Sequence, residues 1–212
     1  MKLKAELIKL KEGQRLHQCD VPIIAITGGI ACGKSTVSDY LSSLGHFVIN
    51  ADQLVKDIYQ TTEAVNFIKA TCPNAISEGS IDFKKLRQEV FNSPELKNKI
   101  EQFIYQRLPQ AFYIKKQAMK PDQQVIFYDV PLLFEKGLDS QVDLLWCVYV
   151  SEQTQIERLM KRDSISEADA KKIIAQQMPI EEKKRRAHRT IDNSKSREMT
   201  LKQVDQELHL IT

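Results

Sequence analysis

Apolar residues form four short runs along the chain, and each run has the length of a single strand. The runs cover residues 21–26, 47–49, 125–128 and 144–150. The third and fourth runs are continuously apolar, which is typical of strands covered on both faces of a sheet. A fifth short strand is expected at residues 190–192. The pattern therefore predicts a buried sheet.

A helix is predicted between the first two strands. Val37, Tyr40, Leu41 and Leu44 recur at the spacing of one helix face. Gly45 stands where a left-handed cap would end that helix. A strand, a helix and a second strand in this order form a β-α-β unit, so the strands are expected to be parallel.

The segment from Gln53 to Lys120 has a largely helical pattern. Residues 80–82 indicate a turn that leads into a helix over residues 84–91. Ser93 and Pro94 indicate the start of another helix, because proline suits the first helical position. Its apolar face contains Ile100, Phe103, Ile104, Leu108 and Phe112. We interpret this region as a helical insertion in the sheet framework.

Charged helices follow the fourth strand. One is expected over residues 153–161, and a second begins at Ser166 with a capping pattern and ends at Met178-Pro179. Residues 181–189 are charged and helical, and Leu201, Val204 and Leu208 mark a closing helix. Residues 6–15 are also interpreted as a helix, without an assigned role.

A phosphate-binding loop lies between the first strand and the first helix. Residues 28–35 read Gly-Gly-Ile-Ala-Cys-Gly-Lys-Ser, a complete G-x-x-x-x-G-K-[ST] pattern. Backbone N–H groups of such a loop converge on phosphate oxygens, lysine reaches the β- and γ-phosphates, and the serine hydroxyl holds Mg²⁺. A simple glycine turn is the alternative, and the strand–loop–helix order disfavours it.

Composition narrows the class of protein only slightly. The chain has 212 residues, 42% hydrophobic and 28% charged, which is ordinary for a globular protein with one sizeable core. The net charge of +3 is too small to indicate nucleic acid by itself. No apolar run approaches a membrane span, and residues 1–20 lack a secretory signal pattern.

The cysteines do not indicate a metal site. Cys19, Cys32, Cys72 and Cys147 are widely spaced, so free thiols in a reducing cytoplasm are expected. Cys32 lies in the loop near a helix N-terminus, a position that favours a lowered pKa. A small filler residue whose backbone N–H contacts phosphate is the favoured interpretation.

Two aspartates end strands at the edge where the loop lies. Asp52 follows the second strand, where a carboxylate could orient an attacking hydroxyl and accept its proton, or hold Mg²⁺ through water. Helix capping is its structural alternative. Asp129 ends the strand at 125–128 and is either a metal-side carboxylate or a cap of the following turn.

Basic side chains follow the fourth strand. Arg158 and Arg162 are four residues apart on one helix, so they share a face that could clamp a transferring phosphate. Ion pairs on a solvated face are the alternative. The basic run at residues 183–189 lacks aromatic residues and is balanced by Glu181 and Glu182, so we interpret it as a solvated helix.

Six separate segments together resemble the dephospho-CoA kinase family, P-loop kinases of coenzyme A synthesis. The segments are residues 27–36, 48–52, 129–135 (Asp-Val-Pro-Leu-Leu-Phe-Glu), 158–163, 176–179 (Gln-Gln-Met-Pro) and 191–194. They occur in the family's order and cover most of residues 21–210. The phosphate loop is generic, whereas the segment at 129–135 and the stretch from Arg162-Asp163 to Gln177-Met178-Pro179 are far more specific in combination.

The resemblance implies an α/β fold of the P-loop NTPase type, a three-layer sandwich with a parallel five-stranded sheet. The nucleotide-binding core would comprise residues 21–59, 120–151 and 180–212. A helical acceptor domain would cover 60–119 and a helical lid 152–179, with residues 1–20 as an N-terminal extension outside the resemblance.

The resemblance also implies a reaction: transfer of the γ-phosphate of ATP to the ribose 3′-hydroxyl of dephospho-CoA, with Mg²⁺. Asp52 would be the base, and Lys34, Arg162 and Arg158 would stabilise charge. The residues that would contact the nucleotide are Gly28, Gly29, Ala31, Cys32, Gly33, Lys34, Ser35 and Thr36. The metal would be held by Ser35 and Asp129. The residues that would contact the acceptor are Asp52, Tyr105, Leu132, Leu133 and Phe134. We expect a cytoplasmic protein that binds neither nucleic acid nor membrane, with a monomer as the favoured state and an oligomer as the alternative.

Two positions depart from the family pattern. Tyr105-Gln106 stands where the family commonly has His-Pro, which weakens acceptor assignments around Tyr105 and Arg107. Asn50 stands where the family commonly has Asp, and this change leaves Asp52 in place.

Other function classes remain open at this point. A kinase acting on a nucleoside monophosphate or a sugar would share the loop and the arginines. A nucleotide-operated switch is disfavoured because the chain has neither an Asn-Lys-x-Asp guanine reader nor an Asp-x-x-Gly switch segment. A nucleic-acid binder using residues 183–189 would show steep salt dependence.

Overall fold

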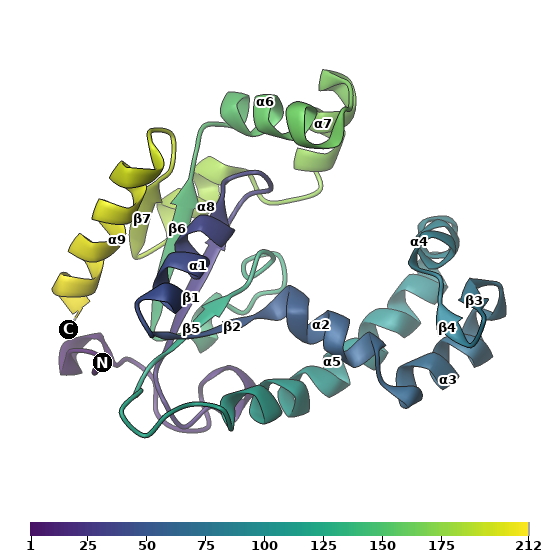
Figure 1. Ribbon diagram of the computed structural model, residues 1–212, viewed down its shortest axis with the longest axis horizontal. Helices are drawn as coiled ribbons and strands as arrows, with labels where there is room; N and C mark the ends of the chain where they lie inside the picture. Colours follow the sequence, from purple (N-terminus) through teal and green to yellow (C-terminus); the bar gives the residue numbers. More distant parts are fainter. Residues whose placement is uncertain (212) are drawn as a thin grey trace. The chain divides into compact units, whose positions relative to one another are not determined.

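The computed structural model describes residues 1–211, which form two compact units (Figure 1). The first unit contains residues 1–50 and 119–212, and the second contains residues 51–118. The helix after the second strand therefore groups with the helical unit, whereas the sequence analysis placed it in the nucleotide-binding core.

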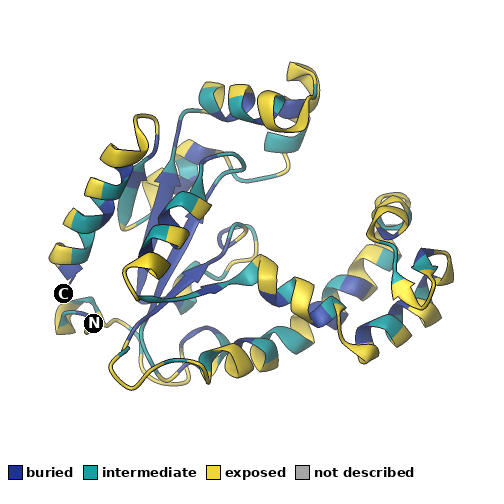
Figure 2. Cartoon of the chain, in the orientation of Figure 1, coloured by how far each residue is buried: buried dark blue, intermediate teal, exposed yellow. Residues whose placement is uncertain are grey.

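A five-stranded parallel sheet forms the centre of the first unit, as predicted. Its order is β2-β5-β1-β6-β7. The strands are β1 (Ile23–Gly28), β2 (Phe47–Asn50), β5 (Ile126–Asp129), β6 (Leu144–Tyr149) and β7 (Arg189–Asp192). Strands β1 and β5 are buried at every residue, which explains their continuous apolar runs (Figure 2).

The first unit also contains helices. They are α1 (Lys34–Ser43), α6 (Glu152–Asp163), α7 (Glu167–Ile174), α8 (Ile180–Arg186) and α9 (Arg197–Ile211), with a 3₁₀ turn at Asp139–Gln141. Helices α1 and α9 pack against each other, and Val37, Leu41 and Val204 join the core formed with the strands. Both of these helices were predicted from their apolar spacing.

The second unit is helical, as the periodicity indicated. It contains α2 (Ala51–Tyr59), α3 (Thr62–Thr71), α4 (Phe83–Asn92) and α5 (Pro94–Lys116), with a 3₁₀ turn at Pro73–Ala75. Strands β3 (Ile76–Ser77) and β4 (Ser80–Ile81) form a small hairpin where only a turn was predicted. Its core includes Ile58, Ile68, Leu86 and Ile104.

None of the helices in residues 1–211 combines the length and the apolar character that a bilayer span requires.

The N-terminal segment is part of the core rather than an appendage. The helix predicted over residues 6–15 is wrong, since only short 3₁₀ turns at Ala5–Leu7 and Leu16–Gln18 form. Leu3 and Leu16 are buried, and the N–H of Lys4 donates to the carbonyl of Ile211 at 2.8 Å.

A buried ion pair fixes this segment to the strands. The guanidinium of Arg15 lies 2.7 Å from the carboxylate of Asp143, and Asp143 has no exposed surface. The same carboxylate also accepts from the N–H groups of Lys9, Leu10 and Ile23. One aspartate therefore joins the N-terminal segment to the first strand.

Replacement of Arg15 by alanine is expected to lower the free energy of unfolding by about 3–5 kcal/mol, because it leaves the Asp143 charge buried without its cation. Urea denaturation would measure the change. Lys202→Ala, which breaks an exposed pair with Glu198, is the matched control and should cost less than about 1 kcal/mol. A similar loss for both variants would contradict the anchoring role.

Candidate active site

The phosphate loop follows β1 and ends in the first turn of α1, as the motif predicted. Gly33 adopts a φ of 80°, a left-handed conformation that glycine tolerates. A Cβ at Gly33 would lie 2.1 Å from the side-chain nitrogen of Asn193, so this position has no room for another residue. Ala31 also has a positive φ, of 61°.

Side chains from distant parts of the chain bind the carbonyl groups of this loop. The carbonyl of Gly28 accepts from Lys183, that of Ala31 from Arg158 and that of Cys32 from Asn193. The peptide bonds of the loop are trans, so the carbonyl of one residue and the N–H of the next point in opposite directions. A carbonyl that is bound on one side of the loop therefore directs the following N–H toward the other side. Within residues 1–211 the N–H groups of Ala31 and Gly33 have no acceptor, and they are available to an anion.

Lys34 and Asp129 form the charged centre of the loop. The ammonium of Lys34 pairs with Oδ1 of Asp129, whose side chain is almost fully buried. The hydroxyl of Ser38 donates to Oδ2 at 2.7 Å, and the amide of Asn50 donates to Oδ2 at 3.3 Å. The asparagine that departs from the family pattern thus gives Asp129 a donor that an aspartate would lack.

Cys32 is not a reactive thiol. It is completely buried, and burial raises the pKa of its thiol. Burial also raises the pKa of Cys147, to about 12. The thiolate is the reactive form, so burial disfavours reaction at Cys32. Its N–H donates to the carbonyl of Gly29 at 3.2 Å, so the predicted contact of that N–H with phosphate stays a prediction.

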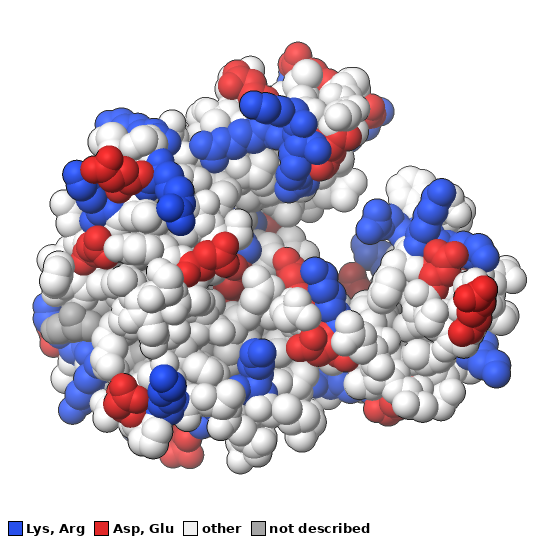
Figure 3. Space-filling model, in the orientation of Figure 1, with Lys and Arg blue, Asp and Glu red and all other residues white. Residues whose placement is uncertain are grey.

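The two arginines predicted to clamp phosphate differ in their surroundings. Arg158 donates to the carbonyl of Asn193 at 2.8 Å and is held against the loop. Arg162 is more than half exposed and pairs with the neighbouring Asp163, which raises the pKa of the arginine. Figure 3 shows basic side chains gathered over α6 and α7 with acidic ones beside them.

The segment after β5 contributes one accessible side chain. Leu132 is 38% exposed, whereas Leu133 is fully buried and Phe134 lies beneath the guanidinium of Arg186. Of the three residues expected near the acceptor, only Leu132 offers a substantial surface.

Asp52 and Tyr105 belong to the helical unit. Asp52 is exposed in the first turn of α2, which begins at Ala51, so it does not occupy the capping position. Its carboxylate is favoured there by the helix dipole. Tyr105 is 43% exposed on α5, and Arg107 of the same helix pairs with Glu63 and stacks on Phe103.

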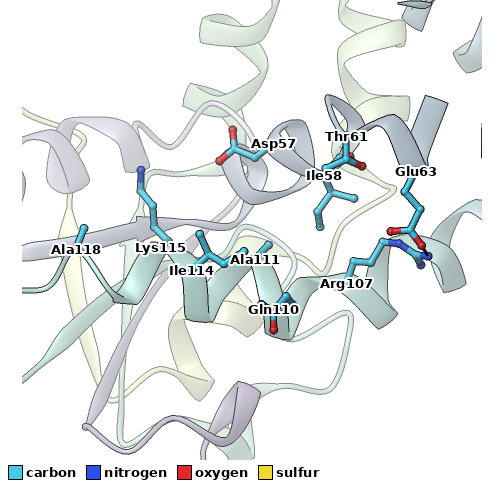
Figure 4. Close-up of a pocket in the computed structure, with 10 residues that line it drawn as sticks. All are labelled: Asp57, Ile58, Thr61, Glu63, Arg107, Gln110, Ala111, Ile114, Lys115 and Ala118. Atoms are coloured by element: carbon cyan, nitrogen blue, oxygen red, sulfur yellow. Dashed lines mark hydrogen bonds and ion pairs between the residues drawn. The ribbon is translucent and has the colours of Figure 1, made fainter. Parts of the chain in front are cut away.

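A pocket of about 510 Å³ also lies within the helical unit, between α2 and α5 (Figure 4). Its apolar wall contains Ile58, Ala111 and Ile114. Asp57 and Ile58, which line it, follow Asp52 by five and six residues and are thus turned by about 140° and 240° around α2. The pocket therefore opens on a different face of α2 from Asp52, and we do not assign it to the reaction.

Lys183 is a site residue that the sequence analysis missed. The prediction of a solvated helix at 183–189 is wrong for this residue, which has no exposed surface. Its ammonium lies 2.7 Å from Glu135 and 3.0 Å from the carbonyl of Pro131. The spacing along the helix could have indicated its burial, because Lys183 lies three residues after the buried Ile180 and thus on the same inward face of α8.

The rest of the basic run also has intramolecular partners. Arg185 pairs with Glu182, Arg186 with Asp139, and Arg189 with Glu207. Lys184 lies over the ring of Tyr149. These four side chains therefore have contacts within the described part of the chain.

The described residues hold no group of three His, Cys, Asp or Glu side chains placed to ligate a metal. Mg²⁺ bound to a nucleotide takes most of its ligands from phosphates and water, and needs only one or two protein groups. The exposed hydroxyl of Ser35 and the nearby carboxylate of Asp129 fit that requirement.

A family model and several curated proteins match this chain over most of its length. A model of the family "Dephospho-CoA kinase" matches residues 22–198. Dephospho-CoA kinase of Streptococcus mutans is 37% identical over 193 residues, which are 88% of this chain and 96% of that protein. The Fusobacterium nucleatum enzyme of the same name is 38% identical over 187 residues, 87% and 96% of the two chains.

Solved structures agree with the sequence matches. Dephospho-CoA kinase from Campylobacter jejuni superimposes with a TM-score of 0.64 at 30% identity, covering 88% of this chain and 96% of that one. A Thermus thermophilus crystal structure gives a TM-score of 0.80 at 29% identity, covering 91% and 98%. The phosphate loop lies within the matched residues, and so do Asp52 and the Gln-Met-Pro segment. The chain belongs to the dephospho-CoA kinase family.

Proposed function

We propose that this protein transfers the γ-phosphate of ATP to the ribose 3′-hydroxyl of dephospho-CoA, giving coenzyme A and ADP. Family membership over residues 22–198 supports the substrates and the reaction. The observation that carries the proposal is the phosphate loop itself, with inward N–H groups beside Lys34.

The loop would bind the nucleotide and stabilise the charge that moves during transfer. The N–H groups of Ala31 and Gly33 contact phosphate oxygens, and the ammonium of Lys34 turns from Asp129 toward the β- and γ-phosphates. Such donors act strongly because they are fixed before the reaction begins. Ser35, with Asp129 beside it, would hold Mg²⁺, and the ion would supply positive charge that neutralises the charge developing on the phosphates.

Asp52 would orient the acceptor hydroxyl and accept its proton. Phosphoryl transfer passes through a loose transition state, so the nucleophile needs positioning more than activation. The carboxylate of Asp52 suits this role because it is exposed in the first turn of α2, where an acceptor could approach it. The helical unit would hold the remainder of the acceptor, with Tyr105 among its exposed side chains.

The segment 152–179 would act as the lid. Arg158 is already held against the loop, whereas Arg162 must exchange Asp163 for phosphate. Arginine suits this exchange because its planar fork matches carboxylate and phosphate oxygens alike. We place the enzyme in the cytoplasm as a monomer, without a nucleic-acid partner.

Product analysis by mass spectrometry would test the function. The protein is incubated with ATP and Mg²⁺ and a panel of dephospho-CoA, nucleoside monophosphates and simple sugars. We expect one added phosphate on dephospho-CoA alone. Phosphate on a nucleoside monophosphate or a sugar would support kinase activity but contradict dephospho-CoA as the acceptor. No transfer to any member of the panel would contradict the proposed catalysis.

A further inference from the structure

One residue of the phosphate loop, Ile30, has both of its backbone polar groups bound by glutamine side chains. Its N–H donates to Oε1 of Gln177 at 2.8 Å, and its carbonyl accepts from Nε2 of Gln155 at 2.7 Å. Gln155 lies in the first turn of α6, and Gln177 follows α7. The two ends of the α6–α7 segment therefore meet at a single residue of the loop.

Gln155 is buried for this contact alone. It is 1% exposed, and its Oε1 is buried without a hydrogen-bond partner among the described residues. Burying a polar atom without a hydrogen-bond partner costs free energy. The hydrogen bond that Nε2 of the same amide donates to Ile30 offsets that cost. A Cβ at Gly29 would lie 2.2 Å from Nε2, which means that the loop needs glycine there for Gln155 to reach Ile30.

Apolar contacts join the same parts of the chain. Ile156, Leu159 and Ala170 form the small buried core of the α6–α7 segment, and the side chains of Ile30 and Ala31 pack against it. The tip of the phosphate loop thus contributes to that core. Both the backbone and the side chain of Ile30 are bound to the α6–α7 segment.

This arrangement fixes the direction of a phosphate-facing group. Gln155 binds the carbonyl of Ile30, and the following peptide N–H, that of Ala31, must point the opposite way. The N–H of Ala31 has no acceptor within residues 1–211. A rotated Ile30–Ala31 peptide would turn this donor away from an anion in the loop.

We propose that Gln155 and Gln177 are positioning residues for nucleotide binding and phosphoryl transfer, which hold Ile30 between them and so fix the phosphate loop to the α6–α7 segment. Gln155 acts as a hydrogen-bond donor and Gln177 as an acceptor. The inference deepens the proposed function, but its test uses ADP and is independent of the acceptor.

Gln155 donates a hydrogen bond to Ile30, whereas Gln177 accepts one from it, so the same substitution at both positions gives a charge-matched test. Gln155→Glu and Gln177→Glu each add one negative charge beside the same residue, yet only Gln177→Glu keeps the oxygen that Ile30 needs. Calorimetric titration with ADP and Mg²⁺ should show affinity at least about tenfold weaker for Gln155→Glu than for Gln177→Glu, because an acceptor would face the Ile30 carbonyl. Equal losses would mean that charge alone acts, and would overturn the proposal.

Uncharged variants provide the second measurement, which also applies if Gln155→Glu does not fold. Gln177→Met and Gln155→Met should each weaken ADP binding by about fivefold, the value of one ordinary hydrogen bond. Hydrogen exchange at the Ile30 amide should accelerate in Gln177→Met and stay slow in Gln177→Glu. Unchanged exchange in Gln177→Met would overturn the assigned contact.

Kinetics separate positioning from a general loss of structure. The Met variants should raise KM for ATP and lower kcat while KM for dephospho-CoA stays constant; a fall in active protein with both KM values unchanged would show a merely structural role. The exposed neighbours Gln153 and Gln176 supply matched controls, and their alanine variants should behave as wild type. If the product test fails while these ADP results hold, the proposed reaction is rejected and the role of the two glutamines in nucleotide binding stands.

Discussion

Lys34→Ala is expected to lower kcat by at least about a hundredfold to a thousandfold, the usual effect of removing one fixed donor to transition-state charge. In the proposed reaction the ammonium of Lys34 would reach the β- and γ-phosphates, where charge develops during transfer. Steady-state kinetics at saturating ATP and acceptor would measure the loss. Unchanged turnover would contradict the assignment of the loop as the catalytic phosphate site.

The same variant has a structural effect that must be separated from catalysis. Lys34 neutralises Asp129, which is 1% exposed and would keep only its contacts with Ser38 and Asn50. A buried carboxylate without its cation destabilises the fold. The double variant Lys34→Ala/Asp129→Asn removes that charge, so we expect it to recover thermal stability relative to Lys34→Ala without recovering turnover.

Asp52→Asn is expected to lower kcat by about a hundredfold or more, at the lower end of the range for a general base because the transition state is loose. The asparagine keeps the shape and hydrogen-bonding reach of the side chain but cannot accept the proton. KM for dephospho-CoA should change little, since the lost interaction belongs to the transition state. Initial rates over a range of acceptor concentrations would separate the two parameters.

Asp57→Asn is the control for this experiment. Asp57 is also an exposed carboxylate on α2, and it accepts a hydrogen bond from Gln53. We expect its kcat to remain near that of the wild type. A rise in KM for Asp52→Asn with kcat unchanged would make Asp52 an acceptor-binding group instead of the base.

The strands and the phosphate loop could be predicted because their signals are local. A buried parallel strand is a continuous apolar run, and the loop is a contiguous motif with its own glycines. The order of the strands in the sheet, with β5 between β2 and β1, carries no such local signal and depends on pairing across the chain. The 3₁₀ turns near the N-terminus were misread as a helix because charged residues with scattered leucines resemble an amphipathic pattern.

The contacts that shape the loop could not be predicted in the same way. Gln155, Lys183 and Asn193 bind loop carbonyls more than a hundred residues away in the sequence. Nothing in their immediate neighbours indicates these partners, and Lys183 was hidden within a run of similar charges. The motif at residues 176–179 marked Gln177 by resemblance, but its contact with Ile30 required the fold.

The anchoring of the N-terminal segment affects what should be regarded as the minimal foldable unit. The family match begins at residue 22 and ends at 198, so it excludes both Arg15 and the greater part of α9. A truncation to those limits would leave Asp143 buried without its guanidinium and would remove Val204 and Ile211 from the core. The region matched by the family model is therefore smaller than the region whose side chains build the core of the first unit.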